Sequence, residues 1–214
     1  MPHLLRRLLA ALIVVLSAAA PARAHPHVWI TAQAEIVWEP EGKVSGVRHR
    51  WTFDPAISAA FTQGLDANGD GRFSPDELKD LARENAEGLA DYDYYTVLKA
   101  NGAKQAFDAP RDPAMTLERD SLILTFLLPL KNATAGRLLA LDISDPTFFV
   151  AFGLAPGEDA VRLLGAPKGC AATVTRPKPP EAAPQQGLSE NLFEALTAAR
   201  SGAAPDGRII VACP

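Results

Sequence analysis

The sequence predicts a mainly β protein, either a β-sandwich or an antiparallel sheet, with a helix-loop-helix insertion and a C-terminal helix, so α+β overall. Short runs rich in β-branched and aromatic residues recur along the 214-residue chain, separated by Gly, Pro, Asn and Asp. Two segments with helical apolar spacing flank a polar loop at 66–77. Hydrophobic residues make up 48% and charged residues 21%, which is typical of a globular domain.

Residues 1–24 have the pattern of a secretory signal peptide. Arg6 and Arg7 form a positive start, an apolar run follows, and Ala22-Arg23-Ala24 is a small-x-small cleavage signal. The apolar run is shorter than the roughly 20 residues that a membrane-spanning helix needs. We therefore expect export, cleavage after Ala24, and a mature chain that begins at His25 and does not span the membrane.

A β-rich domain is expected over residues 25–176, with the helical insertion at about 55–88. Its expected elements are strands 28–38 and 44–53, helices 55–65 and 75–88, and strands 94–99, 121–129, 138–143, 148–154 and 171–176. The turn residues at 39–42 join the first two strands into a hairpin. Gly88 is a stop signal for the second helix.

The C-terminal part is expected to be tied back to this domain. Residues 177–187 contain four prolines and read as a linker. A helix near 188–200 and a strand at 208–212 follow within the last segment, 188–214. Cys170 and Cys213 are the two cysteines of the chain, and in an exported protein an even number predicts a disulfide.

The polar loop at 66–77 has the spacing of an EF-hand calcium loop. The expected oxygen ligands are Asp66, Asn68, Asp70, the carbonyl of Arg72, Ser74 and Glu77. Gly71 stands at the sixth position, where this loop turns sharply. The alternative is an acidic surface turn, because the sequence from Ser74 to Glu77 also resembles a helix start. A single loop of this kind favours a structural calcium over a sensor.

His25-Pro26-His27 places two imidazoles at the start of the first strand. Residues two apart in a strand share a face, and imidazole is a ligand for Zn²⁺, Cu²⁺ and Ni²⁺. If Trp38 opposes Lys43, then His27 faces Asp54, which makes Asp54 a candidate third ligand. The alternative is a mobile terminus that happens to carry two histidines.

The third histidine of the mature chain, His49, does not fit this set. The same pairing places it some 16 Å from His27 and on the opposite face of the hairpin. We interpret His49 as a strand residue with a satisfied hydrogen bond.

Several motifs taken together resemble a known family. They are HPHVWI at 25–30, WTFD at 51–54, DANGDGRFSPDEL at 66–78, DYDYYTVL at 91–98, DPTFFVAF at 145–152 and GAPKGC at 165–170. The set, with the terminal Cys213, is similar to the domain-of-unknown-function 1007 family, described as the periplasmic component of an uncharacterised ABC-type transport system. Some members are ZevA-like zinc-uptake proteins. The resemblance implies a periplasmic location and an inner-membrane permease of nickel/cobalt type as partner.

Composition and motifs narrow the function classes. A net charge of −4 argues against a nucleic-acid binder, and the nucleophile-elbow, zincin, P-loop and dinucleotide motifs are absent from the sequence, which argues against an enzyme. The stretch Asp91–Tyr95 reads as a strand with packed rings, and Asp145 as a turn residue. We expect a periplasmic metal-binding accessory protein for zinc, or nickel/cobalt, stabilised by calcium. The alternative is a calcium-stabilised envelope interaction module with no transition-metal role.

Overall fold

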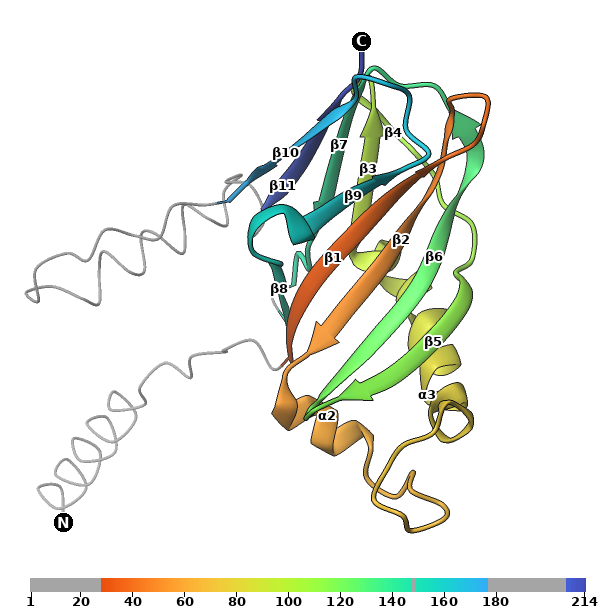
Figure 1. The fold of residues 1–214 in the computed structure, drawn as a ribbon, viewed down its shortest axis with the longest axis vertical. Helices are drawn as coiled ribbons and strands as arrows, with labels where there is room; N and C mark the ends of the chain where they lie inside the picture. Colours follow the sequence, from red (N-terminus) through yellow and green to blue (C-terminus); the bar gives the residue numbers. More distant parts are fainter. Residues whose placement is uncertain (1–27, 148, 177–206) are drawn as a thin grey trace, which may run out of the picture.

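A computed structural model describes residues 28–147, 149–176 and 207–214, and shows two β-sheets packed face to face (Figure 1). The signal-peptide segment 1–24, the linker 177–187 and the C-terminal helix 188–200 predicted above lie outside these residues. No helix of the described part is long and apolar enough to cross a membrane.

The first sheet has the strand order β5-β6-β2-β1-β8, and β9 also pairs with β1. Its strands are β1 (Val28–Trp38), β2 (Val44–Phe53), β5 (Arg111–Glu118), β6 (Ser121–Thr134), β8 (Val150–Leu154) and β9 (Val161–Leu164). The second sheet has the order β10-β11-β7-β3-β4. Its strands are β3 (Thr96–Ala100), β4 (Ala103–Lys104), β7 (Leu138–Ile143), β10 (Ala171–Thr175) and β11 (Arg208–Ala212).

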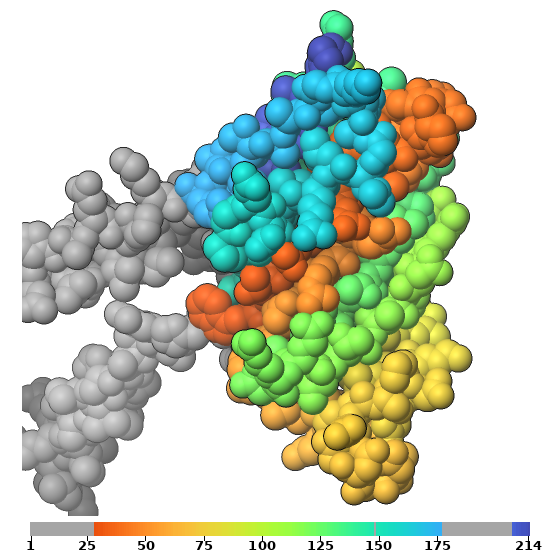
Figure 2. Space-filling model, in the orientation of Figure 1, coloured from red at the N-terminus to blue at the C-terminus, as the bar shows by residue number. Residues whose placement is uncertain are grey.

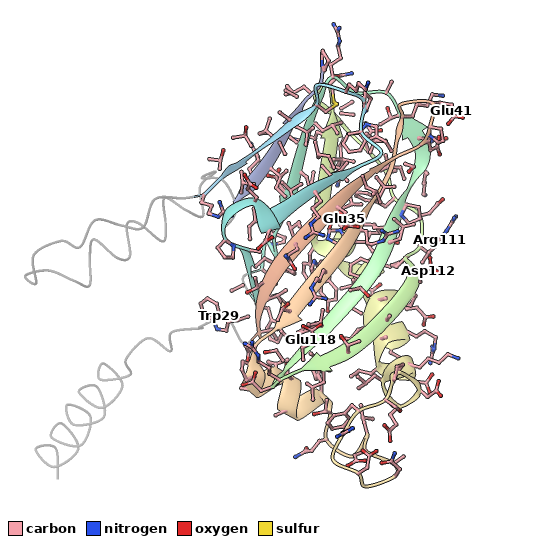
Figure 3. The ribbon with its side chains drawn as sticks, viewed as in Figure 1. Trp29, Glu35, Glu41, Arg111, Asp112 and Glu118 are labelled. Carbon is pink, nitrogen blue, oxygen red and sulfur yellow. A yellow bond between two sulfur atoms is a disulfide. The ribbon has the colours of Figure 1, made fainter. Side chains whose placement is uncertain are left out.

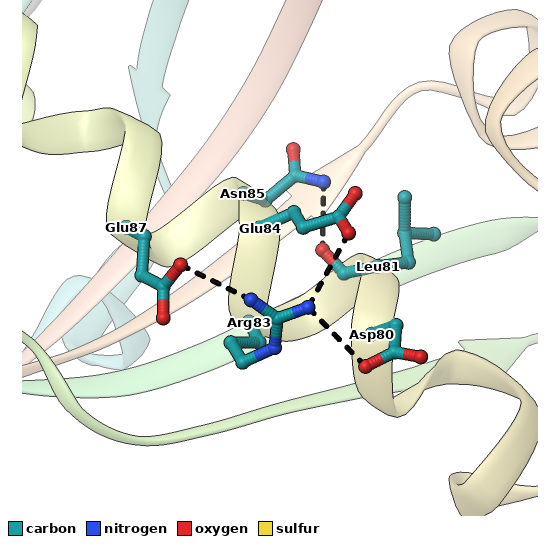
Figure 4. Close-up of polar contacts among 6 residues, drawn as sticks. All are labelled: Asp80, Leu81, Arg83, Glu84, Asn85 and Glu87. Carbon is teal, nitrogen blue, oxygen red and sulfur yellow. Dashed lines mark hydrogen bonds and ion pairs between the residues drawn. The ribbon is translucent and has the colours of Figure 1, made fainter.

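The helical elements are α2 (Pro55–Phe61), α3 (Pro75–Gly88) and the 3-10 segments η1 (Leu89–Tyr95) and η2 (Gly157–Ala160). Helices α2 and α3 lie at one end of the first sheet, whereas η2 lies between β8 and β9 (Figure 1). Leu78, Ala82 and Ala86 of α3 are buried. Glu84 and Glu87 instead surround Arg83 on its exposed side, at 3.3 and 3.2 Å (Figure 4).

The core forms because β1 and β2 alternate buried and exposed residues, as a strand covered on one face should. Ile36 and Val47 of the first sheet join Leu98, Leu141 and Ile209 of the second in one buried cluster. The opposite face of the first sheet is exposed (Figure 2). There Glu35 pairs with Arg48 at 3.0 Å (Figure 3), an exposed contact worth under about 1 kcal/mol.

The first sheet is mixed, which corrects the wholly antiparallel form of the prediction. Strands β8 and β9 both pair parallel with β1, β8 along Val28–Ala32 and β9 along Ala34–Val37. A single strand edge is therefore shared by two short strands placed end to end. Sequence patterns of four or five residues do not distinguish parallel from antiparallel pairing.

The disulfide between Cys170 and Cys213 is confirmed. The two residues flank the paired strands β10 and β11, whose register sets Ala171 opposite Ala212. A second contact anchors β11, because Arg208 donates two hydrogen bonds to the carboxylate of Asp142 in β7, at 2.6 and 3.0 Å.

Candidate functional site

The loop between α2 and α3 is curled around the carboxylate of Asp66. Asp66 Oδ1 accepts hydrogen bonds from the backbone nitrogens of Gly69 and Asp70 at 2.8 and 3.1 Å, and Oδ2 accepts from Gly71 at 2.9 Å. Gly69 and Gly71 have positive φ values of 71° and 76°, which L side chains rarely adopt. The two glycines therefore permit the tight turn that the sequence pattern predicts.

Glu77 closes the loop from its other end. Its Oε1 accepts a hydrogen bond from the backbone nitrogen of Ala67 at 3.0 Å, and Oε2 accepts from the nitrogen of Ser74 at 2.8 Å. Ser74 and Glu77 form a capping box at the start of α3. These bonds, those with Ser74 first, lower the pKa of Glu77. Glu77, the last predicted calcium ligand, is thus hydrogen-bonded to the residue that follows Asp66, the first predicted ligand.

The remaining predicted ligands also bond within the loop. The backbone nitrogen of Asp70 donates to Asn68 Oδ1 at 2.9 Å, and that of Arg72 donates to Asp70 Oδ1 at 2.8 Å. In the described part of the chain, no three His, Cys, Asp or Glu side chains are grouped so that they could hold a metal ion. The donor set of three carboxylates, an amide, a carbonyl and a hydroxyl fits a hard cation, and calcium binding here stays a prediction.

Asp54 is a helix cap in this structure. Its Oδ1 accepts hydrogen bonds from the nitrogens of Ala56 and Ile57 at the start of α2, and Oδ2 accepts from Trp29 at 3.1 Å. The predicted pairing of Asp54 with His27 is wrong, because Trp29 takes that place (Figure 3).

The register differs because the hairpin loop is longer than predicted. Trp38 pairs with Val44, not with Lys43, and an irregularity follows at Ser45, so that Val37 pairs with Gly46. The observed cross-strand partner of each residue is thus two positions from the predicted one. A shift of two leaves every side chain on the predicted face of the sheet. His25 and His27 lie outside the described residues, and their role as ligands, with or without Asp54, stays a prediction.

His49 is confirmed as a strand residue, but only one of its ring nitrogens is hydrogen-bonded, because Nδ1 has no partner among the described residues. Its ring is fully buried, stacks on Phe126 at 4.9 Å and lies 3.3 Å through Nε2 from Thr96 Oγ1. The Thr96 hydroxyl donates to the carbonyl of Tyr94, so Nε2 carries the proton and donates to Thr96. Burial lowers the pKa of His49 to about 3, and the ring is neutral in the folded protein.

The buried His49 makes stability depend on pH. In the unfolded chain His49 binds a proton near pH 6.5, whereas in the folded protein it does so only near pH 3. The contribution of His49 to the free energy of unfolding is therefore complete above pH 6.5 and is lost as the pH falls. We expect a loss of about 2 kcal/mol between pH 8 and pH 5, measured by urea unfolding. In His49→Phe this part of the pH dependence should vanish, and an equal slope in both proteins would contradict it.

A cleft of about 560 Å³ lies where the two motifs 91–98 and 145–152 meet. Asp91, Asp93, Tyr95 and Asp145 all line it. Asp93 pairs with Lys104 at 3.4 Å. The side chain of Asp91 makes no hydrogen bond or ion pair within the part of the chain that the structure describes. The cleft therefore has a negative rim.

Asp145 shapes this cleft by holding the turn that follows it. Its carboxylate accepts hydrogen bonds from the backbone nitrogens of Thr147, Phe149 and Val150, at 2.7, 3.1 and 2.9 Å. Burial would raise the pKa of Asp145, but these bonds outweigh it and the pKa is lowered. The turn role expected for this residue is confirmed.

The segment Asp91–Tyr95 is a 3-10 element and not the strand predicted for it. Asp93, Tyr94 and Tyr95 have φ values of 51°, 55° and 49° in succession. Left-handed non-glycine residues cost energy and persist only where their surroundings enforce them. This backbone stacks Tyr92 on Tyr95 at 5.2 Å. Burial, followed by the charge of Asp145, raises the pKa of Tyr95 to about 12.

Comparison with known proteins identifies a family. A family model described as a protein of unknown function (DUF1007) matches residues 10–213. No curated protein matches the chain. Among solved structures, AChBP from Bulinus truncatus is similar at 11% identity, over 89% of this chain and 87% of that chain, with a TM-score of 0.35. A likeness this weak carries no inference about function.

Proposed function

The chain belongs to the DUF1007 family, and we propose that it is a periplasmic metal-binding accessory protein of a transition-metal transport system. The metal is zinc, or nickel/cobalt, and His25 and His27 bind it. A calcium ion in the loop 66–77 has a structural role, and the partner is an inner-membrane permease of nickel/cobalt type. The confirmed disulfide is compatible with export.

The observation that carries this proposal is the position of the acidic cleft beside the start of β1. Val28 lines the apolar pocket that shares Tyr92 and Tyr95 with the cleft. We infer that His25 and His27, which precede Val28 in the chain, bind the metal together with this cleft. Carboxylates lower the energy of a bound cation and complete the ligand sets of histidine sites.

Removing the histidines is expected to abolish tight zinc binding. We expect the mature chain to bind one Zn²⁺ in a competition titration with a chromophoric chelator, and His25→Ala/His27→Ala to lose it. Asp91→Asn/Asp93→Asn should weaken binding by about 10- to 100-fold, as lost outer partners of metal ligands do. The control Glu39→Gln/Glu41→Gln removes the same charge from the turn between β1 and β2, at the other end of β1, and should bind as wild type.

Millimolar affinity of the wild type for Zn²⁺, Ni²⁺ and Co²⁺ alike would overturn the metal role. The same histidine variant also distinguishes the two functions in cells. A metal accessory protein requires His25 and His27 for growth under metal limitation, whereas an interaction module does not. The intact mass of the exported protein shows whether the mature chain begins at His25.

A further inference from the structure

Strand β10 forms one edge of the second sheet (Figure 1). It pairs with β11 on its inner side, and no strand of the described residues pairs with its outer side. Four of its five residues are exposed. The outer side of such a strand presents unpaired N–H and C=O groups, which are a template for another strand.

The register of the second sheet identifies the backbone groups of β10 that point outward. Cys213, which follows β11, donates its backbone N–H to the residue before β7. Because these groups alternate in direction along a strand, Ile210 directs its groups to β10, where it pairs with Thr173. The N–H and C=O groups of Ala172 and Val174 therefore point away from β11. They have no hydrogen-bond partner within the ranges that the structure describes.

This arrangement is complementary to itself. When a second β10 lies antiparallel with Thr173 opposite its own copy, Ala172 of each strand lies opposite Val174 of the other. Both residues point their backbone groups outward, so each such pair exchanges two N–H···O bonds. A two-fold axis at Thr173 therefore gives a partner to all four outward groups of each copy.

The side chains of β10 fit the same pairing. Ala172 and Val174 lie opposite Val211 and Ile209, which are buried, so they face the core side of the sheet. Ala172 is nevertheless exposed, and Val174 is only partly buried. A second copy would cover both of them with apolar side chains. On the other face the two Thr173 side chains meet, and β10 contains no charged residue that would repel its copy.

Other strand edges in the described part of the chain carry features that prevent pairing. Strand β5 contains Pro113, charged side chains and an irregular register after Arg111. Strand β4 has two residues and ends in a lysine that lies opposite another lysine in β3. Proline, lysine, bulges and short length are the usual protections of an edge. Strand β10 has no proline, no charge and a regular register.

From these observations we propose that β10 pairs with β10 of a second copy of this chain, about a two-fold axis at Thr173, so that the second sheets of the two copies become continuous. The interface consists of four main-chain hydrogen bonds and a small apolar contact. An interface of that size is at the low end of specific contacts, so the dimer is weak and depends on concentration. This dimer is independent of the transition-metal role.

The first test is sedimentation velocity of the full-length mature chain at about 1 to 500 µM. We expect a reversible equilibrium between monomer and dimer. Ala172→Pro removes an outward N–H but no bond to β11, and should raise the Kd of the dimer at least tenfold. The matched control Ala172→Thr keeps the N–H and should dimerise as wild type. A wild type that stays monomeric throughout, or a dimer that Ala172→Pro leaves unchanged, would overturn the proposal.

The second test measures the register and leaves the backbone of β10 intact. Thr173→Cys places two thiols at opposed residues whose Cα atoms are about 4.5 Å apart, a separation that a disulfide spans. Mild oxidation should therefore cross-link the dimer, seen on a non-reducing gel. Thr175→Cys is the matched control, because its two copies are about 13 Å apart in this register and should not cross-link. Cross-linking of both variants to the same extent, or of neither, would contradict the two-fold axis at Thr173.

Discussion

Replacing Asp66 and Glu77 by alanine is expected to lower the melting temperature of the protein in calcium to that of the chelated wild type. A ligand that binds only the folded state stabilises it by about 2.7 kcal/mol at a hundred times its Kd. In a chain of this length that is a shift of roughly 5–10 °C. The measurement is a thermal melt followed by circular dichroism, with calcium and with a chelator.

The control must separate calcium from the hydrogen bonds that the same carboxylates make. Asp66 and Glu77 accept backbone N–H bonds across the loop, so alanine removes these as well. Asp66→Asn/Glu77→Gln keeps oxygen acceptors while removing both charges, and it should lose the calcium response. Asp76→Ala, a neighbouring charge outside the ligand pattern, should retain it. If calcium does not change the melting temperature of the wild type, the structural role of calcium is refuted.

The effect should extend beyond the loop because of what α3 covers. Leu78 and Ala82 of α3 and Leu89 of η1 belong to the core cluster of the described residues. Helix α3 follows the loop directly. Loosening the loop frees the start of α3 and exposes this part of the core.

The sequence pattern located most strands because their side chains alternate. β7 and β11 have the predicted bounds. β5 was missed because Pro113 and exposed charges interrupt its pattern, as is usual on an edge strand. β9 was missed because four residues are too few to show a period. η1 was misassigned because its left-handed residues are not glycines.

The loop 66–77 and the apolar pocket that Val28 lines differ in how they could be found. The loop is a local pattern, because the spacing of its residues alone brings the predicted ligand oxygens together. It can therefore be found from the sequence. The pocket brings together Val28, Trp51 and Val150 through strand pairing, and η1 adds Leu89 and Tyr95. Finding this pocket from the sequence would require the correct register between β1 and β2. The predicted register differs from the observed one by two residues.

Breaking the disulfide is expected to cost about 4 kcal/mol of stability. Cys170 and Cys213 are 43 residues apart, and a cross-link closing a loop of that size removes about this much chain entropy from the unfolded state. We expect Cys170→Ser/Cys213→Ser to lower the urea midpoint accordingly. Dithiothreitol should lower the wild type to the same value and leave the variant unchanged.

The position of β11 explains why this bond is expected to matter. β11 lies inside the second sheet, between β10 and β7, and contributes Ile209 and Val211 to the core. The chain from 177 to 206 separates it from β10, so without the disulfide its docking must offset the entropy of closing that loop. A further anchor of β11 is the Arg208–Asp142 pair. Asp142→Asn should therefore destabilise the reduced protein more than the oxidised one, and equal effects in both would show that the disulfide does not hold β11 in place.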